Sequence, residues 1–329
     1  MQRHVLIVAS LLALQASIVA QQSATPEAAS GQVSLVCPLD GFSFTWPAVK
    51  RLPSNVPYDS DFCRYAFGTF GPAEDVITCP HCNYTDIRMR FSTTTLDDRT
   101  KDKLRVALAA SGYRGVQDSF LMIPAWERCR LGEMCAKARG LKASETVDFA
   151  LLAVYSVRVQ STRSATLSLP FGDPLRNATY FASAERGMLE TNDPGKRARL
   201  KLQLAMLAQR MGLPTERERW LTAASEDPGA TTALKVGIES FRKMTALEAS
   251  LQRQLLSMLD QALAEKDIVP DKHAFYLYLK ADTHRRLGDL KQAAMEFSEL
   301  HESAAVPPQM RDFVGYFVTL LEEKPTEKK

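Results

Sequence analysis

The sequence predicts a mostly α protein in which a small irregular β module precedes an array of αα-hairpins. Two observations carry this prediction. Residues 34–92 are rich in Cys, Pro, Gly and Asp and contain only short strand-like runs. After Phe91, glycine becomes less frequent and apolar residues recur at helical spacing. With 329 residues, the chain is long enough for two domains.

The N-terminus has the features of an export signal. Arg3 and His4 precede an apolar run over residues 5–14, and small residues up to Ala20 offer a cleavage point. The apolar core is short for a membrane span, and Gln15 interrupts it. We therefore expect a signal peptide over residues 1–20, a disordered linker over 21–33 and a periplasmic or secreted protein. No stable membrane span is expected after cleavage.

Composition and motifs argue against several functional classes. The chain is 45% hydrophobic and 24% charged, which is ordinary for a soluble globular protein. A net charge of +3 is too small to indicate a nucleic-acid partner. The sequence has no zincin motif, phosphate loop, dinucleotide fingerprint or nucleophile elbow. A non-enzymatic protein is therefore favoured.

The β module is expected to contain two cysteine turns between short strands. Strands over residues 34–36 and 42–44 would surround Cys37, with Asp40-Gly41 as a favoured turn dipeptide. Strands over residues 76–78 and 87–89 would surround Cys79 in the same way. The long loop between them, residues 50–71, needs a metal or a disulfide to hold it.

The remaining chain, residues 93–323, is expected to be a helical domain with a disordered tail over 324–329. The expected helices cover residues 96–110, 125–139, 144–160, 175–190, 195–211, 216–224, 231–265, 270–287, 289–303 and 308–322. The pattern over residues 231–265 fits either one long helix or two.

Residues 275–297 carry the pattern of a tetratricopeptide (TPR) helix-turn-helix repeat. Gly288 would close the first helix, Ala293 would allow close helix approach and Phe297 would fill the gap between the helices. A weaker copy places Gly212 at the turn and Trp220 at the packing position. A third candidate, which pairs residues 144–160 with 175–190, has helical spacing alone. A generic αα-hairpin is the alternative for each copy.

The two cysteines of Cys79-Pro80-His81-Cys82 have the spacing of a metal-binding knuckle. Cys37 begins a second copy of this turn, in which Asp40 stands at the position of the second cysteine. We predict a structural Zn²⁺ site with Cys37, Cys63, Cys79 and Cys82 as ligands, because four thiolates give a closed tetrahedral site. Asp40 is the alternative ligand. The His81 side chain is expected to point away from the metal.

Export leaves other states open for the six cysteines, because disulfides form outside the cytosol. Cys37–Cys63 and Cys79–Cys82 bridges are one alternative. A redox-active dithiol is another, although the sequence after Cys82 does not continue as the helix that a thioredoxin-like motif requires. A Cys129–Cys135 bridge would require a helix break between them, and otherwise both would be buried thiols.

An ordered series of motifs resembles a bacterial family catalogued as domain of unknown function 2225. The series is Cys37-Pro38-x-Asp40-Gly41-x-x-Phe44, Asp59-x-Asp61-Phe62 and Val76-x-x-Cys79-Pro80-x-Cys82-x-Tyr84. The resemblance implies a zinc-ribbon-like module followed by TPR-like helices. This chain differs from the family's commonest form at Asp40, where a cysteine is expected. The resemblance implies no reaction.

These observations favour an exported, non-enzymatic protein with a structural zinc site and a TPR-like scaffold that binds a protein or peptide partner. The alternative is a thiol-disulfide or metal-handling protein that acts through Cys79 and Cys82.

Overall fold

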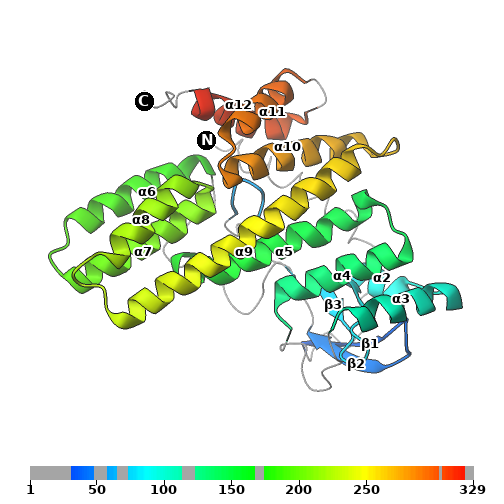
Figure 1. The fold of residues 1–329 in the computed structure, drawn as a ribbon. Coiled ribbons are helices and arrows are strands. Elements are labelled where there is room, and N and C mark those ends of the chain that lie inside the picture. The colour runs from blue at the N-terminus through cyan, green and yellow to red at the C-terminus, as the bar shows by residue number, and fades with distance from the viewer. Residues whose placement is uncertain are drawn as a thin grey trace.

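The computed structural model describes residues 31–47, 58–64, 73–112, 123–166, 174–303 and 306–322 (Figure 1). These residues form a mostly helical protein with a small β region near the N-terminus, so the predicted fold class is confirmed. The predicted signal peptide, most of the predicted linker and the predicted C-terminal tail lie outside the described residues.

The β region consists of two antiparallel hairpins, each of which encloses one cysteine turn. Strand β1 (Gln32–Val36) pairs with β2 (Ser43–Pro47), and β3 (Val76–Thr78) pairs with β4 (Thr85–Ile87). β1 starts within the predicted linker, because Gln32 and Val33 pair with Pro47 and Trp46. Trp46 is buried and contributes to the core beneath the hairpins.

The strand expected over residues 87–89 is wrong, since the strand ends at Ile87 and helix α2 (Arg88–Thr93) follows directly. The helical turn directs Phe91 into the core, where its ring contacts those of Phe44 and Tyr84. Thr93 donates a hydrogen bond to the Met89 carbonyl, which reinforces this turn. Asp97 is the N-cap of helix α3 (Asp98–Ala110), and its side chain accepts a hydrogen bond from the Thr100 N–H.

Three helices form the centre of the molecule: α4 (Ala125–Arg139), α5 (Ala143–Thr166) and α9 (Thr232–Leu263). α5 packs along α9 and against α4, and their shared core includes Phe149 and Leu259. Gly132 of α4 lies against the Phe149 ring, which occupies the space that a Cβ would need. The left-handed Gly140 ends α4.

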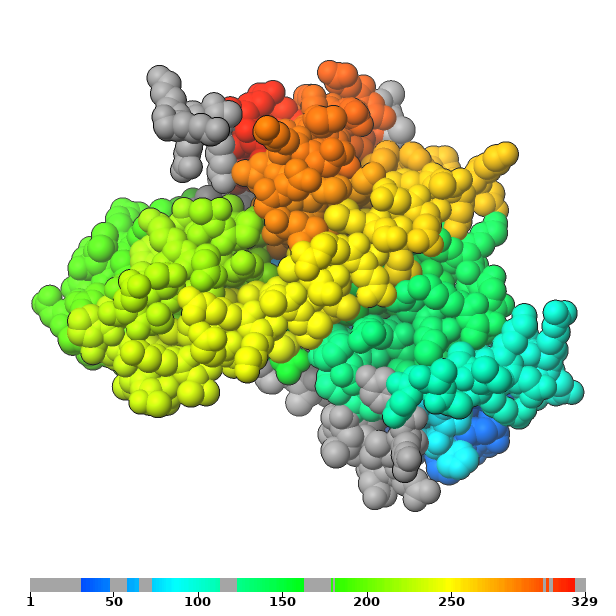
Figure 2. All heavy atoms as spheres, in the orientation of Figure 1, coloured from blue at the N-terminus to red at the C-terminus, as the bar shows by residue number. Residues whose placement is uncertain are grey.

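α9 is one helix of 32 residues, which settles the question left open by the sequence. At 1.5 Å per residue it is about 48 Å long. Figure 2 shows it crossing one face of the molecule. Ile238 and Phe241 in its first half belong to one core, whereas Leu255 and Leu259 in its second half belong to another.

Six further helices form two groups beside these central helices. The first group comprises α6 (Pro174–Leu189), α7 (Pro194–Met211) and α8 (Pro214–Ser225), and the second comprises α10 (Pro270–Leu287), α11 (Leu290–Glu302) and α12 (Pro308–Glu322). None of the helices in the described part of the chain is long and apolar enough to cross a bilayer.

The two expected glycine turns are present. Gly212 joins α7 to α8 and Gly288 joins α10 to α11, both in the left-handed conformation. Ala293 and Phe297 are fully buried where α11 packs on α10, and Trp220 is buried in α8. The third expected hairpin is not the principal packing arrangement, because α5 packs mainly on α9 and α4, whereas α6 packs on α7.

Candidate metal centre

The two cysteine turns have the same backbone construction. In the first, the Cys37 N–H donates to the Phe42 carbonyl at 2.9 Å, and the Gly41 N–H donates to the Cys37 carbonyl at 2.9 Å. In the second, the Cys79 N–H donates to the Tyr84 carbonyl at 2.8 Å, and the Asn83 N–H donates to the Cys79 carbonyl at 2.9 Å.

The fifth residue of each turn has a positive φ, 75° at Gly41 and 62° at Asn83, which reverses the chain after the second ligand position. Asp40 precedes Gly41 just as Cys82 precedes Asn83. The two turns are therefore equivalent, and Asp40 occupies the position of a second cysteine.

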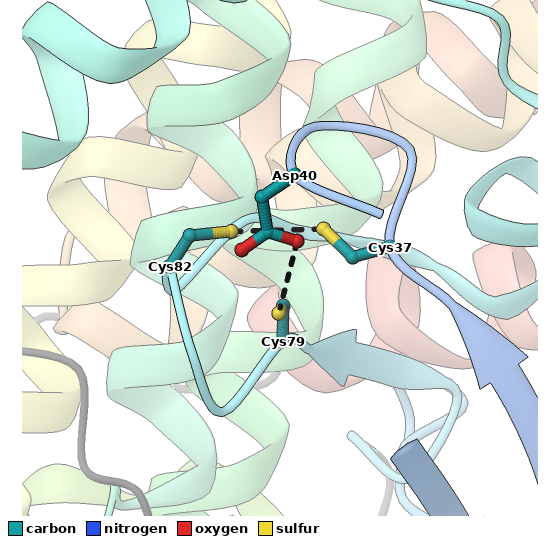
Figure 3. A group of neighbouring side chains, drawn as sticks. All are labelled: Cys37, Asp40, Cys79 and Cys82. Atoms are coloured by element: carbon teal, nitrogen blue, oxygen red, sulfur yellow. Dashed lines mark hydrogen bonds between the residues drawn. The ribbon is translucent and has the colours of Figure 1, made fainter. Parts of the chain in front are cut away.

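The two turns bring four potential ligands together (Figure 3). One atom from each of Cys37, Asp40, Cys79 and Cys82 lies within 4.8 Å of the others. The Cys37 and Cys82 sulfurs are 3.6 Å apart, and the Cys79 sulfur is 4.0 Å from an oxygen of Asp40. These residues could hold a metal ion.

Cys63 is the one member of the expected ligand set that does not join this cluster. It is fully buried in the core formed with α4, α5 and α9, on a turn of residues 58–64. Burial raises the pKa of the Cys63 thiol well above its ordinary value. The structure thus assembles three cysteines and the alternative ligand Asp40, instead of four cysteines.

His81 lies on the solvent side of the cluster, as expected from the sequence. Its Nδ1 is 2.7 Å from Asp40 Oδ2, and its ring stacks on Phe42 at a centroid distance of 5.2 Å. The hydrogen bond to Asp40 raises the pKa of His81. The same bond lowers the pKa of Asp40, although partial burial opposes this shift. His81 thus orients the carboxylate and favours its charged form.

The three thiols do not lose their protons equally. Hydrogen bonds from the other two thiols lower the pKa of Cys79 to about 3, although burial opposes the shift. The hydrogen bond with Cys79 raises the pKa of Cys37, and the hydrogen bonds with Cys37 and Cys79 raise that of Cys82. The Cys79 thiol therefore loses its proton readily, whereas a cation must displace the protons of Cys37 and Cys82.

Cys129 and Cys135 lie on the unbroken helix α4 and face different cores. Because α4 continues through Gly132, the helix break that a bridge between them requires is absent. Burial raises the pKa of each thiol to about 12. Both are buried, free cysteines in this structure.

The structure contains a second polar centre, which the sequence patterns did not predict. Asp59 and Asp61 are buried and face three arginines of the helices, Arg158, Arg210 and Arg286. A fourth buried arginine, Arg285, contacts Ser60 and Asp282 beside them. An available signal was the position of Arg158, which stands between Val157 and Val159 and follows the apolar residues 149–155 of a predicted helix.

Comparisons with known proteins add no identity. No family model matches the chain, and no curated protein and no solved structure match it. The resemblance to the domain of unknown function 2225 therefore stays a prediction from the motifs.

Proposed function

We propose that the cysteine turns form a structural zinc site. The observation that carries this proposal is the convergence of three sulfurs and one carboxylate from two equivalent turns. A tetrahedral site with Zn–S bonds of about 2.3 Å has ligand atoms about 3.8 Å apart. The separation of 3.6 Å between the sulfurs of Cys37 and Cys82 is near this value. Thiolate-rich sites favour zinc over the hard cations magnesium and calcium.

The sequence position of the ligands supports a structural role. Cys79 follows Asp40 by 39 residues, so an ion held between the two turns closes a long loop. Closing such a loop removes conformational freedom from the unfolded chain, which stabilises the folded module.

Metal analysis of the purified protein tests this proposal. We expect one zinc per chain, with zinc lost in Cys79→Ser and bound more tightly in Asp40→Cys, where a fourth thiolate replaces the carboxylate. Cys129→Ala is the matched control, because that cysteine is buried away from the turns and its variant should keep zinc. A metal-free protein with a reversible Cys79–Cys82 disulfide would contradict the proposal.

We further propose that the helices form a TPR-like scaffold of an exported, non-enzymatic protein, with a protein or peptide as its partner. The glycine turns at Gly212 and Gly288 and the buried Ala293 and Phe297 support this assignment.

N-terminal sequencing of the protein recovered from the periplasm or medium tests export, and we expect the mature chain to begin at Gln21. An unprocessed N-terminus on cytosolic protein would refute export.

The second candidate function is thiol-disulfide or metal-handling chemistry at Cys79 and Cys82. The lowered pKa of Cys79 favours it, because thiolates are the reactive form of cysteine. Against it, the residues after Cys82 form strand β4 and not a helix whose N-terminus faces the thiol. A measurable dithiol–disulfide equilibrium between these two cysteines, with turnover of a disulfide substrate, would favour this candidate over the structural site.

A further inference from the structure

The turn of residues 58–64 belongs in space to the helical array, although its sequence neighbours belong to the β region. Figure 1 shows it as a short blue loop beside α10, apart from β1 and β2. The turn is closed by an antiparallel bridge between Tyr58 and Arg64 and by a hydrogen bond from the Asp59 N–H to the Cys63 carbonyl at 2.8 Å. Phe62 at its tip has a positive φ of 67°.

The two carboxylates of the turn bind arginines from three helices. Asp61 accepts two hydrogen bonds from Arg158 of α5, at 2.9 and 2.7 Å, and lies 3.5 Å from Arg286 of α10. Asp59 contacts Arg158 at 3.3 Å and Arg210 of α7 at 3.2 Å. These five side chains are all buried.

Side chains of the helices also form hydrogen bonds with the Ser60 hydroxyl and with backbone carbonyls of the turn. Ser60 Oγ donates to Asp282 at 3.0 Å and accepts from Arg285 at 3.0 Å and from Arg286 at 2.7 Å. The Tyr278 hydroxyl donates to the Ser60 carbonyl at 2.8 Å, and the Tyr155 hydroxyl donates to the next carbonyl.

The Phe62 ring packs between α10 and α12. Its centroid lies 5.7 Å from that of Phe275, 5.6 Å from Tyr278 and 6.0 Å from Phe313. The array thus surrounds the turn as a binding protein surrounds a peptide, with charged, polar and aromatic contacts.

The charges of this centre balance only when the turn is present. Among the described residues, the helices contribute four buried arginines and two buried carboxylates, Glu248 and Asp282, to this centre, which is a net charge of +2. Asp59 and Asp61 bring the net charge to zero. Buried charges without partners are strongly unfavourable, so the helices need these carboxylates in order to pack closely.

We propose that residues 58–64 are a built-in acidic ligand of the helical array, and that the array closes only with this turn in place. The junction of α5, α7, α9 and α10 is therefore occupied by the chain itself. The partner proposed above for the array would therefore bind to another surface.

Thiol labelling of the full-length protein tests this proposal, because Cys63 lies on the turn and Cys129 lies in the adjoining helical core, both fully buried. Labelling by N-ethylmaleimide under native conditions is followed by peptide mass mapping. In Asp59→Asn we expect both cysteines to react faster, on the order of 100-fold, because loss of one buried charge favours opening. Unchanged labelling would overturn the proposal. Faster labelling of Cys63 alone would also overturn it, because the array would then stay closed without the turn.

A charge-compensated variant tests the neutrality argument directly. Asp59→Asn combined with Arg210→Gln removes one charge of each sign, so Cys63 and Cys129 should react more slowly than in Asp59→Asn alone. If the two substitutions instead multiply their effects, the balance of charge is not what closes the array. Should Asp59→Asn fail to fold, Ser60→Ala provides a milder change, with labelling of both cysteines faster by about tenfold. Unchanged labelling in Ser60→Ala would equally overturn the proposal.

Asp86→Asn is the matched control for loss of a buried carboxylate. Asp86 of strand β4 pairs with Arg90 and Arg139 and lies near Cys135, whereas the carboxylates of the turn pair with Arg158, Arg210 and Arg286. We expect this variant to accelerate labelling of Cys135 and to leave Cys63 protected. Equal acceleration of Cys63 in this control would show that loss of any buried charge has the same effect, which would refute the specific role of the turn.

Discussion

Replacing Asp282 by a neutral residue should destabilise the protein, because the Asp282 carboxylate contributes stability that is lost in acid. Asp282 is fully buried in α10 and contacts Arg285 at 2.8 Å and Arg286 at 2.7 Å. Burial alone would raise the pKa of this carboxyl, but the two guanidinium groups outweigh burial and lower the pKa to about 2.

The sign and the size of the effect follow from this pKa. A carboxyl whose pKa is lower in the folded state contributes stability that is fully present above its ordinary pKa of 3.8. This stability is lost as the pH falls from about 4 to about 2. The lowering of the Asp282 pKa corresponds to about 2–3 kcal/mol of folding free energy, at roughly 1.4 kcal/mol per pKa unit. We therefore expect Asp282→Asn to lower the free energy of unfolding by about 2–3 kcal/mol at pH 7.

Urea denaturation followed by circular dichroism, from pH 7 to pH 2.5, checks this expectation. The difference between the native protein and Asp282→Asn should narrow below about pH 4, as the native carboxyl becomes protonated. Asp98→Asn is the control, because Asp98 is fully exposed, and its small difference from the native protein should stay nearly constant. A difference for Asp282→Asn that is constant or grows with acidification would refute the reasoning.

Three further predictions follow from packing and from the thiols. Gly132→Ala should destabilise the protein by about 1–3 kcal/mol, since the Phe149 ring fills the site, whereas Gly187→Ala in open space should be neutral or stabilising. Phe297→Ala should cost about 3–5 kcal/mol in unfolding experiments, and Met295→Ala, exposed on the same helix, less than about 0.5. Equal effects within either pair would contradict these packing arguments. Zinc affinity, measured by chelator competition, should fall by about 100-fold per pH unit on acidification, because two thiol protons are displaced; affinity independent of pH would exclude this ligand chemistry.

Local sequence determined most of the helical architecture. Helices α4, α10 and α12 begin and end at the residues expected from the sequence. Helix hydrogen bonds link residues four apart, and terminal signals such as Pro270 and Gly288 act within one turn of the chain. The equivalence of the two cysteine turns was also partly visible, because Asp40-Gly41 repeats the spacing of Cys82-Asn83.

The tertiary structure decided how distant residues are combined. It placed Asp40 with the three cysteines and Cys63 in the helical core, although either residue could complete the ligand set as judged from the sequence alone. It also buried Asp59 and Asp61 among arginines that lie about a hundred residues or more away in sequence. The energy of a buried charge or thiol depends on its partners in space, and those partners are set by the packing of α5, α7, α9 and α10, which local sequence patterns do not specify.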